Sequence, residues 1–285
     1  MGMQIYKALL KDLEIITKYA YQLTLEKSHR VWDLQEKYGI YIYTKMCLSS
    51  IGILRICPKN ELYVPIRKKL IWDISSTATL TRTIVDAYMI FFYLIVDEVE
   101  NSEKEFRFIL WKLHAECERL NMLQSIGSTD PRLSDLKAEI ESLQGQLKVN
   151  QFFQSLLLPQ QQEKYLKGRY HRHITHEQIC ERAGIPYNIY SSAQQYLSNH
   201  VHTYHFSLQQ LNLNPNTPEG IGLFITVLSY AIGFLAFATR DFISLFLDEK
   251  LNVPKDILAI ISDWEDKMNI EKLHNENNKT ISKNK

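Results

Sequence analysis

Apolar residues recur along this chain at intervals of three and four, which is the spacing of amphipathic α-helices. Only 10 glycines and 8 prolines interrupt the 285 residues, and no well-spaced alternating segments predict a sheet. The pattern therefore predicts an all-α, multi-helix bundle. Its helices are expected at roughly 4–29, 31–55, 68–98, 102–124, 131–149, 151–167, 176–183, 187–209, 218–247 and 254–271.

Turn-forming residues mark the clearest boundaries between these helices. Pro58 and Pro65 frame one loop, Asp130-Pro131 begins a helix, and "NLNPNTPEG" at 212–220 is dense in turn residues. We expect a single all-helical domain over 1–271 with a possible helical arm at 131–167. Residues 272–285 lack apolar content and are expected to form a disordered, solvated tail.

The segment 131–149 carries a short heptad seam. Its apolar residues are spaced three, four, three and four apart, at Leu133, Leu136, Ile140, Leu143 and Leu147. One interpretation is an amphipathic helix that packs on its own bundle. The other is an arm that pairs with a second copy or with a partner protein.

The stretch Gly222–Thr239 is uncharged and reaches the lower edge of membrane-spanning length. Its small and hydroxyl residues suit close packing between helices, and Arg240-Asp241 ends it without a basic cluster. We therefore expect a long, largely buried central helix of a protein that does not enter the membrane.

Helix 68–98 is mostly apolar but carries a narrow polar stripe. At about 100° per residue its members fall on one face, and they are Ser75, Thr79, Arg82, Asp86 and Tyr93. Because an unpartnered buried guanidinium is costly, Arg82 requires Asp86 and further acceptors. The pair is either a structural ion pair or part of a polar pocket, into which His114 and Arg119 of the next helix could reach.

Six of the nine histidines lie in two H-x-H-x-x-H clusters, at 171–176 and 200–205. On a continuous helix 187–209, His200 falls in the apolar face, whereas Ser198 and His202 lie on the opposite side. We expect Arg82, Asp86, Ser198 and His202 to converge on one interior pocket. A zinc site built from both clusters is geometrically conceivable, but the second cluster lacks neighbouring carboxylates, so no metal is expected.

The charge and the cysteines of the chain bear on its binding partners and its cellular location. A formal net charge of +1 gives no general attraction to nucleic acid, so RNA would have to contact a local patch such as "KYLKGRYHRH" at 164–173. The four cysteines show no C-x-x-C spacing, and no basic-then-apolar leader precedes them. A reducing cytoplasm is the expected location.

Three stretches resemble a family of uncharacterised bacterial all-helical proteins, grouped loosely with the HEPN (higher eukaryotes and prokaryotes nucleotide-binding) superfamily. They are "DISSTATLTRTIVDAYMIFFYLIVDE" at 73–98, "EFRFILWKLHAECERLNML" at 105–123 and "YNIYSSAQQYLSNHVHTYHFS" at 187–207, about a quarter of the chain. In that pattern the arginine and the acid four residues later fall on Arg82 and Asp86. The serine and histidine of the late helix fall on Ser198 and His202.

The resemblance implies a metal-independent role on RNA. HEPN ribonucleases use an arginine shortly before a histidine, and two protomers pool these residues to steady phosphate charge and move a proton. The spacing occurs twice here, as Arg107-x6-His114 and Arg169-x6-His176. The polar residue that usually follows the arginine is absent from both matches.

These patterns rank three functions. The first is a HEPN-like protein that acts on RNA or a nucleotide without a cofactor, as a homodimer or with a partner protein, in a bacterial antiphage or stress system. The second is a non-catalytic helical subunit that docks a partner through the 133–147 seam. The third is a metal-dependent phosphohydrolase built from the two histidine clusters.

Overall fold

The computed structural model describes residues 1–27, 33–65, 70–156, 159–246 and 253–268, and in these residues it contains twelve α-helices and no strand. The predicted all-α, multi-helix fold is therefore confirmed. The expected tail at 272–285 lies outside the described residues.

The chain divides into two compact units, where the sequence led us to expect one domain over 1–271. The first unit comprises residues 1–96 and 179–285, and the second comprises residues 97–178. The second unit is larger than the expected arm at 131–167, because it also contains the whole helix that follows residue 100.

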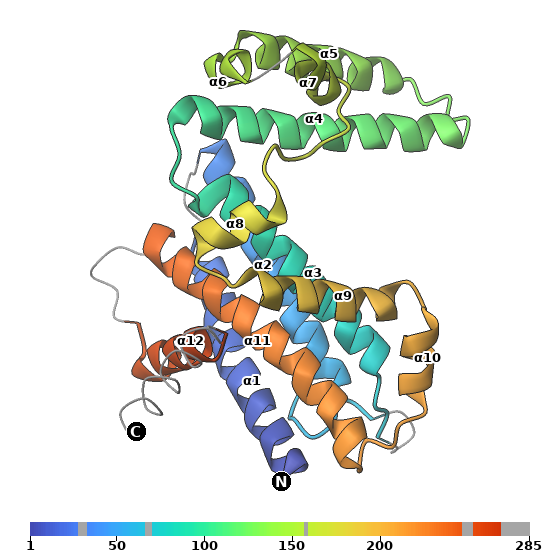
Figure 1. The fold of residues 1–285 in the computed structure, drawn as a ribbon, viewed down its shortest axis with the longest axis vertical. Helices are drawn as coiled ribbons and strands as arrows, with labels where there is room; N and C mark the ends of the chain where they lie inside the picture. Colours follow the sequence, from blue (N-terminus) through green and yellow to red (C-terminus); the bar gives the residue numbers. More distant parts are fainter. Residues whose placement is uncertain (28–32, 66–69, 157–158, 247–252, 269–285) are drawn as a thin grey trace, which may run out of the picture. The chain divides into compact units, whose positions relative to one another are not determined.

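The first unit is built on four long helices. They are α1 (Gly2–Lys27), α2 (Leu34–Ile56), α3 (Ile74–Phe91) and α11 (Pro218–Phe246), which lie side by side in Figure 1. A π-helical turn, η1 (Phe92–Val96), continues α3. The shorter helices α9 (Tyr187–Val201), α10 (His205–Leu211) and α12 (Lys255–Met268) complete the unit, and α8 (His176–Ala183) leads into it from the second unit.

Helix α11 is the largely buried central helix that the sequence predicted. Ala231, Ile232 and Phe234 are fully buried. Gly233 lets α12 approach, since an added Cβ would lie 2.9 Å from Met268 Cγ. Two helical segments in the described part of the chain are long and apolar enough to cross a membrane, namely α3 with η1, and α11. In their most apolar 18-residue stretches, 61% and 67% of the residues respectively are buried within the protein.

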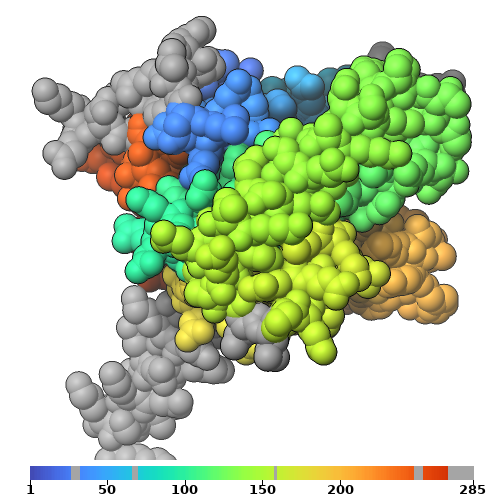
Figure 2. Space-filling model, turned by 90° about the horizontal axis from the view of Figure 1, so that it is seen from above, coloured from blue at the N-terminus to red at the C-terminus, as the bar shows by residue number. Residues whose placement is uncertain are grey.

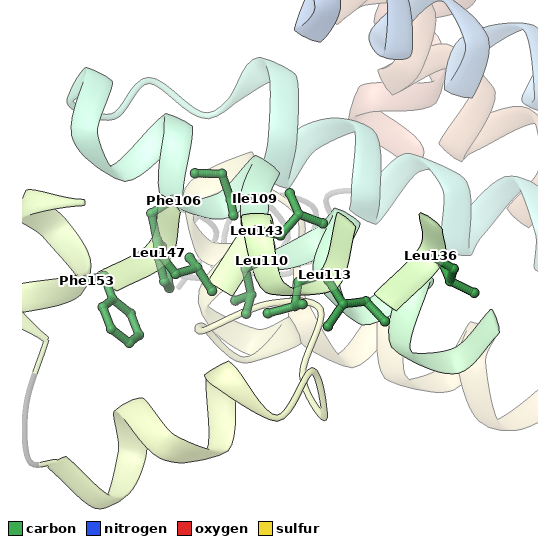
Figure 3. Close-up of a cluster of buried hydrophobic side chains, with 9 residues drawn as sticks. Phe106, Ile109, Leu110, Leu113, Leu136, Leu143, Leu147 and Phe153 are labelled. Atoms are coloured by element: carbon green, nitrogen blue, oxygen red, sulfur yellow. The ribbon is translucent and has the colours of Figure 1, made fainter. Parts of the chain in front are cut away.

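The second unit has its own apolar core. It contains α4 (Asn101–Ser125), α5 (Leu133–Val149), α6 (Gln151–Ser155) and α7 (Pro159–Leu166), drawn in green to yellow-green in Figure 2. Leucines of α5 interdigitate with Phe106, Leu110 and Leu113 of α4 (Figure 3). The seam residues Leu136, Ile140, Leu143 and Leu147 are all at least 92% buried, so the seam packs on its own unit rather than forming an arm for a partner.

Two expected helices are interrupted. The segment 151–167 forms α6 and α7 instead of one helix. The segment 187–209 breaks after Val201, where Thr203 adopts a left-handed backbone with φ 54°, and resumes at His205. Helix α3 begins later than expected, because Asp73 caps it by accepting from the Ser76 amide at 2.9 Å.

Candidate functional site

The polar stripe of α3 meets α9 in a network centred on Arg82. Its Nε donates to Asp86 Oδ2 at 2.8 Å, and its Nη1 donates to the Gln194 carbonyl at 3.0 Å and to Ser198 Oγ. Asp86 in turn accepts from the side-chain amide of Gln194. Arg82 therefore ties two helices together through both side-chain and backbone acceptors.

This network differs from the expected interior pocket. The Arg82 side chain is 24% exposed and that of Asp86 is 50% exposed, so the network lies at the surface. His202 does not join it, because α9 ends at Val201 and leaves His202 exposed beside the ring of Tyr204. Three of the four expected residues thus meet, and Gln194 takes the fourth place.

His200 lies inward on α9, as its position in the apolar face predicted. It is 6% exposed, and its Nδ1 lies 3.4 Å from Ser75 Oγ of the α3 stripe. Burial lowers the pKa of His200, while the Gln210 side chain, which can accept from the protonated ring, opposes that shift. A neutral, packed histidine follows from this environment.

In the second unit, Arg107 is a buried structural cation. It is 1% exposed, and it donates to Asp97 at 2.7 Å and, through Nε at 3.0 Å, to Glu103. Glu103 also lies 3.3 Å from His173 Nε2. Because two carboxylates already neutralise this guanidinium, the Arg107-x6-His114 spacing does not present an arginine to a phosphate.

A second group of polar residues in this unit gathers around His171. The rings of His114 and His171 lie 5.2 Å apart, and Arg172 Nη1 lies 3.2 Å from His171 Nε2. His176 is also within hydrogen-bonding distance of Arg172. We call His114, His171, Arg172 and His176 the histidine group.

The protonation states within the histidine group follow from its partners. A guanidinium only donates, so His171 Nε2 is an unprotonated acceptor. Burial first, and then the charges of Arg172 and His114, lower the pKa of His171 to about 4. His114 Nδ1 lies 2.8 Å from the Gly168 carbonyl and must donate to it, which leaves Nε2 as its second functional nitrogen.

Basic side chains occur close in sequence to the histidine group. Lys164, Lys167 and Arg169 are exposed, and Lys167 pairs with Glu163 at 2.6 Å. Arg119, expected to reach inward, is instead 58% exposed and lies 3.6 Å from Glu116 on the outside of α4. Arg119 and His114 belong to the second unit, whereas Arg82 belongs to the first.

The two histidine clusters do not assemble a metal site. His173 faces Glu103, His176 faces Arg172, and His202 is exposed. Among the residues that the structure describes, no group of three histidine, cysteine or acidic side chains is placed to hold a metal ion.

Sequence reasoning missed Gln194, His171 and Arg172 as site residues. The dipeptide His171-Arg172 lies within the basic stretch 164–173, which was the available signal. Nothing in that stretch indicates that the loop after α7 brings His171 close to His114. Loops lack the regular spacing of apolar residues from which the direction of side chains is predicted in a helix.

These features define an all-α protein with a surface arginine network and a separate histidine group. Residues 36–220 match the model of DUF5677, a family of unknown function, so the chain belongs to this family. Comparison with curated proteins and with solved structures finds no match.

Proposed function

We propose that this protein binds and acts on RNA or a nucleotide without a metal, as a HEPN-like protein, and that the histidine group of the second unit carries the chemistry. The observation that supports this most is a neutral His171 held beside His114 and Arg172. Two imidazoles and a guanidinium are the groups that metal-independent cleavage of a phosphodiester requires.

Cleavage of the RNA backbone needs no proton donor or acceptor beyond these residues. A neutral imidazole takes the proton of the ribose 2′-hydroxyl as that oxygen attacks phosphorus, and the bond from phosphorus to the 5′-oxygen breaks. In this role His114 carries a second proton on Nε2 and gives it to the leaving 5′-oxygen. A pKa of about 4 keeps His171 unprotonated, and a phosphate that draws Arg172 away frees Nε2 and raises that pKa toward the working pH. Arg172 then offsets the charge that develops on the phosphate.

Arg82 provides a second place for an anion in the same proposal. Its Nε and Nη1 donate hydrogen bonds, and Nη2 has no hydrogen-bond partner among the residues that the structure describes. Ser198 and Asp86 hold the guanidinium in position, and a quarter of the side chain faces solvent. In this role Arg82 binds a phosphate and Asp86 and Ser198 are positioning residues, whereas exposed His202 and Arg119 contribute at most further phosphate contacts.

The experiment is cleavage of fluorogenic single-stranded RNA by purified protein in excess chelator. His114→Ala and His171→Ala are each expected to slow cleavage by about 100-fold or more. His205→Ala, an exposed histidine of the first unit, is the matched control and should leave the rate unchanged. Wild-type protein that neither cuts nor binds RNA or nucleotides, or a fully active His171→Ala variant, would refute the proposal.

The low pKa of His171 also predicts how stability depends on pH. Both states are neutral at His171 above its ordinary pKa of 6.5, so it has no effect there. As pH falls from about 6.5 to about 4, the unfolded chain binds a proton that the folded chain resists, and stability is lost. His171→Gln should flatten this part of a plot of melting temperature against pH, and an unchanged slope would contradict the assignment.

We place this activity in the cytoplasm of a bacterium, as the toxic or defensive part of a stress or antiphage system. Induced wild-type protein should then slow growth, and His171→Ala should relieve that effect. The buried share of α11 supports a protein that stays in the supernatant after high-speed centrifugation. Quantitative recovery in alkaline-washed membranes would overturn this location.

A second candidate function is a helical interaction subunit that associates with a second copy of the chain. The seam at 133–147 cannot serve this purpose, since its leucines pack on α4. An exposed apolar surface in the first unit can, and its residues are Val201, Tyr204, Phe206, Leu208, Leu211 and Leu213, each 41–56% exposed. Residues 188–218 contain no lysine, arginine, aspartate or glutamate, so two such surfaces would meet without repulsion.

Sedimentation equilibrium tests this association. Wild-type protein is expected to be dimeric at micromolar concentration, and Phe206→Glu with Leu211→Glu should make it monomeric. A paired substitution on the outer face of α2, such as Tyr41→Glu with Leu48→Glu, is the control. A monomeric wild-type protein would remove this candidate.

A further inference from the structure

Helix α2 carries an exposed apolar stripe that the proposed function does not use. Leu34, Tyr41 and Leu48 are seven residues apart and are 54%, 55% and 56% exposed. At 3.6 residues per turn they lie within about 20° of one line along the helix. This is the spacing of the apolar seam that one helix presents to another in a coiled coil.

A groove runs beside this stripe, between α2 and α3. It has a volume of about 410 Å³ and is lined by Tyr41, Thr44, Lys45, Leu48, Ser49 and Leu80. Close to the groove, Gly52 lets α3 pack tightly on α2, because an added Cβ there would lie 3.0 Å from Leu80 Cδ1. A side chain from a neighbouring helix would fill this groove as a knob fills a hole.

The flanks of the stripe are basic on both sides. Lys37 and Arg55 lie about 40° to one side of the Tyr41 line and Lys45 lies about 40° to the other, and all three are exposed. Glu36, the single acidic residue of α2, turns away into a capping box with Asp33, with the two reciprocal bonds at 2.8 and 3.1 Å. The face therefore has an apolar centre and positive edges.

We propose that α2 is a docking site for an amphipathic helix of a partner protein that carries apolar residues at heptad spacing and acidic residues on both flanks. Such a helix places leucine-like side chains between Tyr41, Leu48 and Leu80 and its carboxylates beside Lys37 and Lys45. In helix-in-groove recognition, apolar anchor residues provide most of the affinity and flanking charges provide the specificity, and the proposed complex has both features.

Charge decides against the two occupants that the chain itself could supply. A second copy of α2 packed antiparallel about Tyr41 would place Lys37 opposite Lys45, and a parallel copy would place Lys37 opposite itself. The C-terminal residues 269–285 carry four lysines and two glutamates, so they share the sign of the surface. A bilayer surface also attracts basic apolar helices, but it has no need of a groove shaped for a side chain.

The experiment uses two synthetic helical peptides of three heptads, one with leucine at the seam and glutamate on both flanks, the other with lysine on the flanks. Binding of each to full-length protein is measured by fluorescence anisotropy at low salt. The acidic peptide is expected to bind at least about tenfold tighter than the basic one. Leu48→Asp should abolish binding, and Lys37→Glu with Lys45→Glu should reverse the preference between the two peptides.

Three further measurements test whether α2 is the binding site and which partner occupies it. Leu258→Asp, at an exposed position of α12 outside both proposed surfaces, should leave peptide binding unchanged, and loss of binding there would refute the α2 site. Tighter peptide binding after removal of residues 269–285 would show that the tail occupies the groove. Sedimentation with phosphatidylserine vesicles that depends on Leu48, without a preference between peptides, would assign the face to a membrane surface and overturn the proposal.

Discussion

Arg82 and Arg107 look alike in the sequence and differ in the structure. Each lies in a long helix and forms an ion pair with an acid four residues away, Asp86 and Glu103 respectively. Arg107 is 1% exposed and bonds two carboxylates, whereas Arg82 is 24% exposed and its acid is half exposed. Equal spacing therefore gives a buried structural cation in one unit and a surface bridge in the other.

The carboxylates that each arginine neutralises differ in burial as well. Asp97 is 9% exposed and Glu103 is 15% exposed, so removal of Arg107 would leave two charges in a poorly hydrated site. Asp86 at 50% exposure remains hydrated when Arg82 is removed. The free-energy cost of losing each arginine should follow the burial of the acid that it leaves behind.

The largest effect is expected for Arg107→Met. Methionine has a similar length but cannot neutralise Asp97 or Glu103, so the free energy of unfolding should fall by roughly 3–5 kcal/mol. Urea denaturation followed by circular dichroism measures this loss. The double variant Arg107→Met with Glu103→Gln should recover part of it, since one of the stranded charges is then absent.

A loss below about 1 kcal/mol for Arg107→Met would mean that burial of the acids does not set the cost. If that variant also lost RNA binding while it kept its stability, Arg107 would belong to the phosphate site after all, and the two arginines would exchange roles.

An intermediate effect is expected for Arg240→Met on α11. Arg240 is 36% exposed, but it bonds Asp241, which is 7% exposed, and Glu265 of α12, each at 2.7 Å. Burial raises the pKa of Asp241, and Arg240 opposes that rise. Among the residues that the structure describes, Asp241 would keep the Tyr88 hydroxyl at 2.9 Å, so we expect a loss of about 2–3 kcal/mol.

The pH dependence of Arg240→Met gives the check. Without Arg240 the pKa of Asp241 rises further, so the destabilisation should be large at neutral pH, where the carboxylate is charged. It should shrink as the pH falls and Asp241 becomes protonated. A loss that is the same at pH 4 and pH 7 would show that packing of the Arg240 stem, not charge, is responsible.

The helices were predictable because a repeated period accumulates over many residues. The expected bounds of the segment 102–124 agree with the structure within one residue at each end, and the expected start of α11 agrees as well, since uninterrupted three-and-four spacing and turn residues define them. The expected end of that helix at 247 lies outside the described residues. The breaks in 151–167 and 187–209 were not predicted. A single left-handed residue such as Thr203 interrupts a helix without changing the apolar period around it.

The site was less predictable than the fold. A helical wheel shows which side of a helix a residue lies on, but not how deeply that side is buried in the protein. The wheel placed Arg82 and Ser198 on facing stripes, and they do meet. It could not show that the α3–α9 contact lies at the surface, nor that the end of α9 at Val201 would leave His202 outside the network. The contact between His114 and His171 depends on a loop, and no spacing in the sequence encodes it.

The smallest effect is expected for Arg82→Met, and it separates structure from function most cleanly. If the stripe were interior, this change would cost about 3 kcal/mol or more by orphaning Asp86. With Asp86 half exposed, and with the α3–α9 contact retained through His200 and Ser75, the loss should be within about 1 kcal/mol. Because the fold survives, RNA affinity can be compared directly between wild type, Arg82→Met and the control Arg132→Met, an exposed arginine paired with Asp130. If only Arg82→Met binds RNA more weakly, Arg82 contacts a phosphate of the RNA. If all three proteins bind RNA equally well, the role of Arg82 is to join α3 to α9.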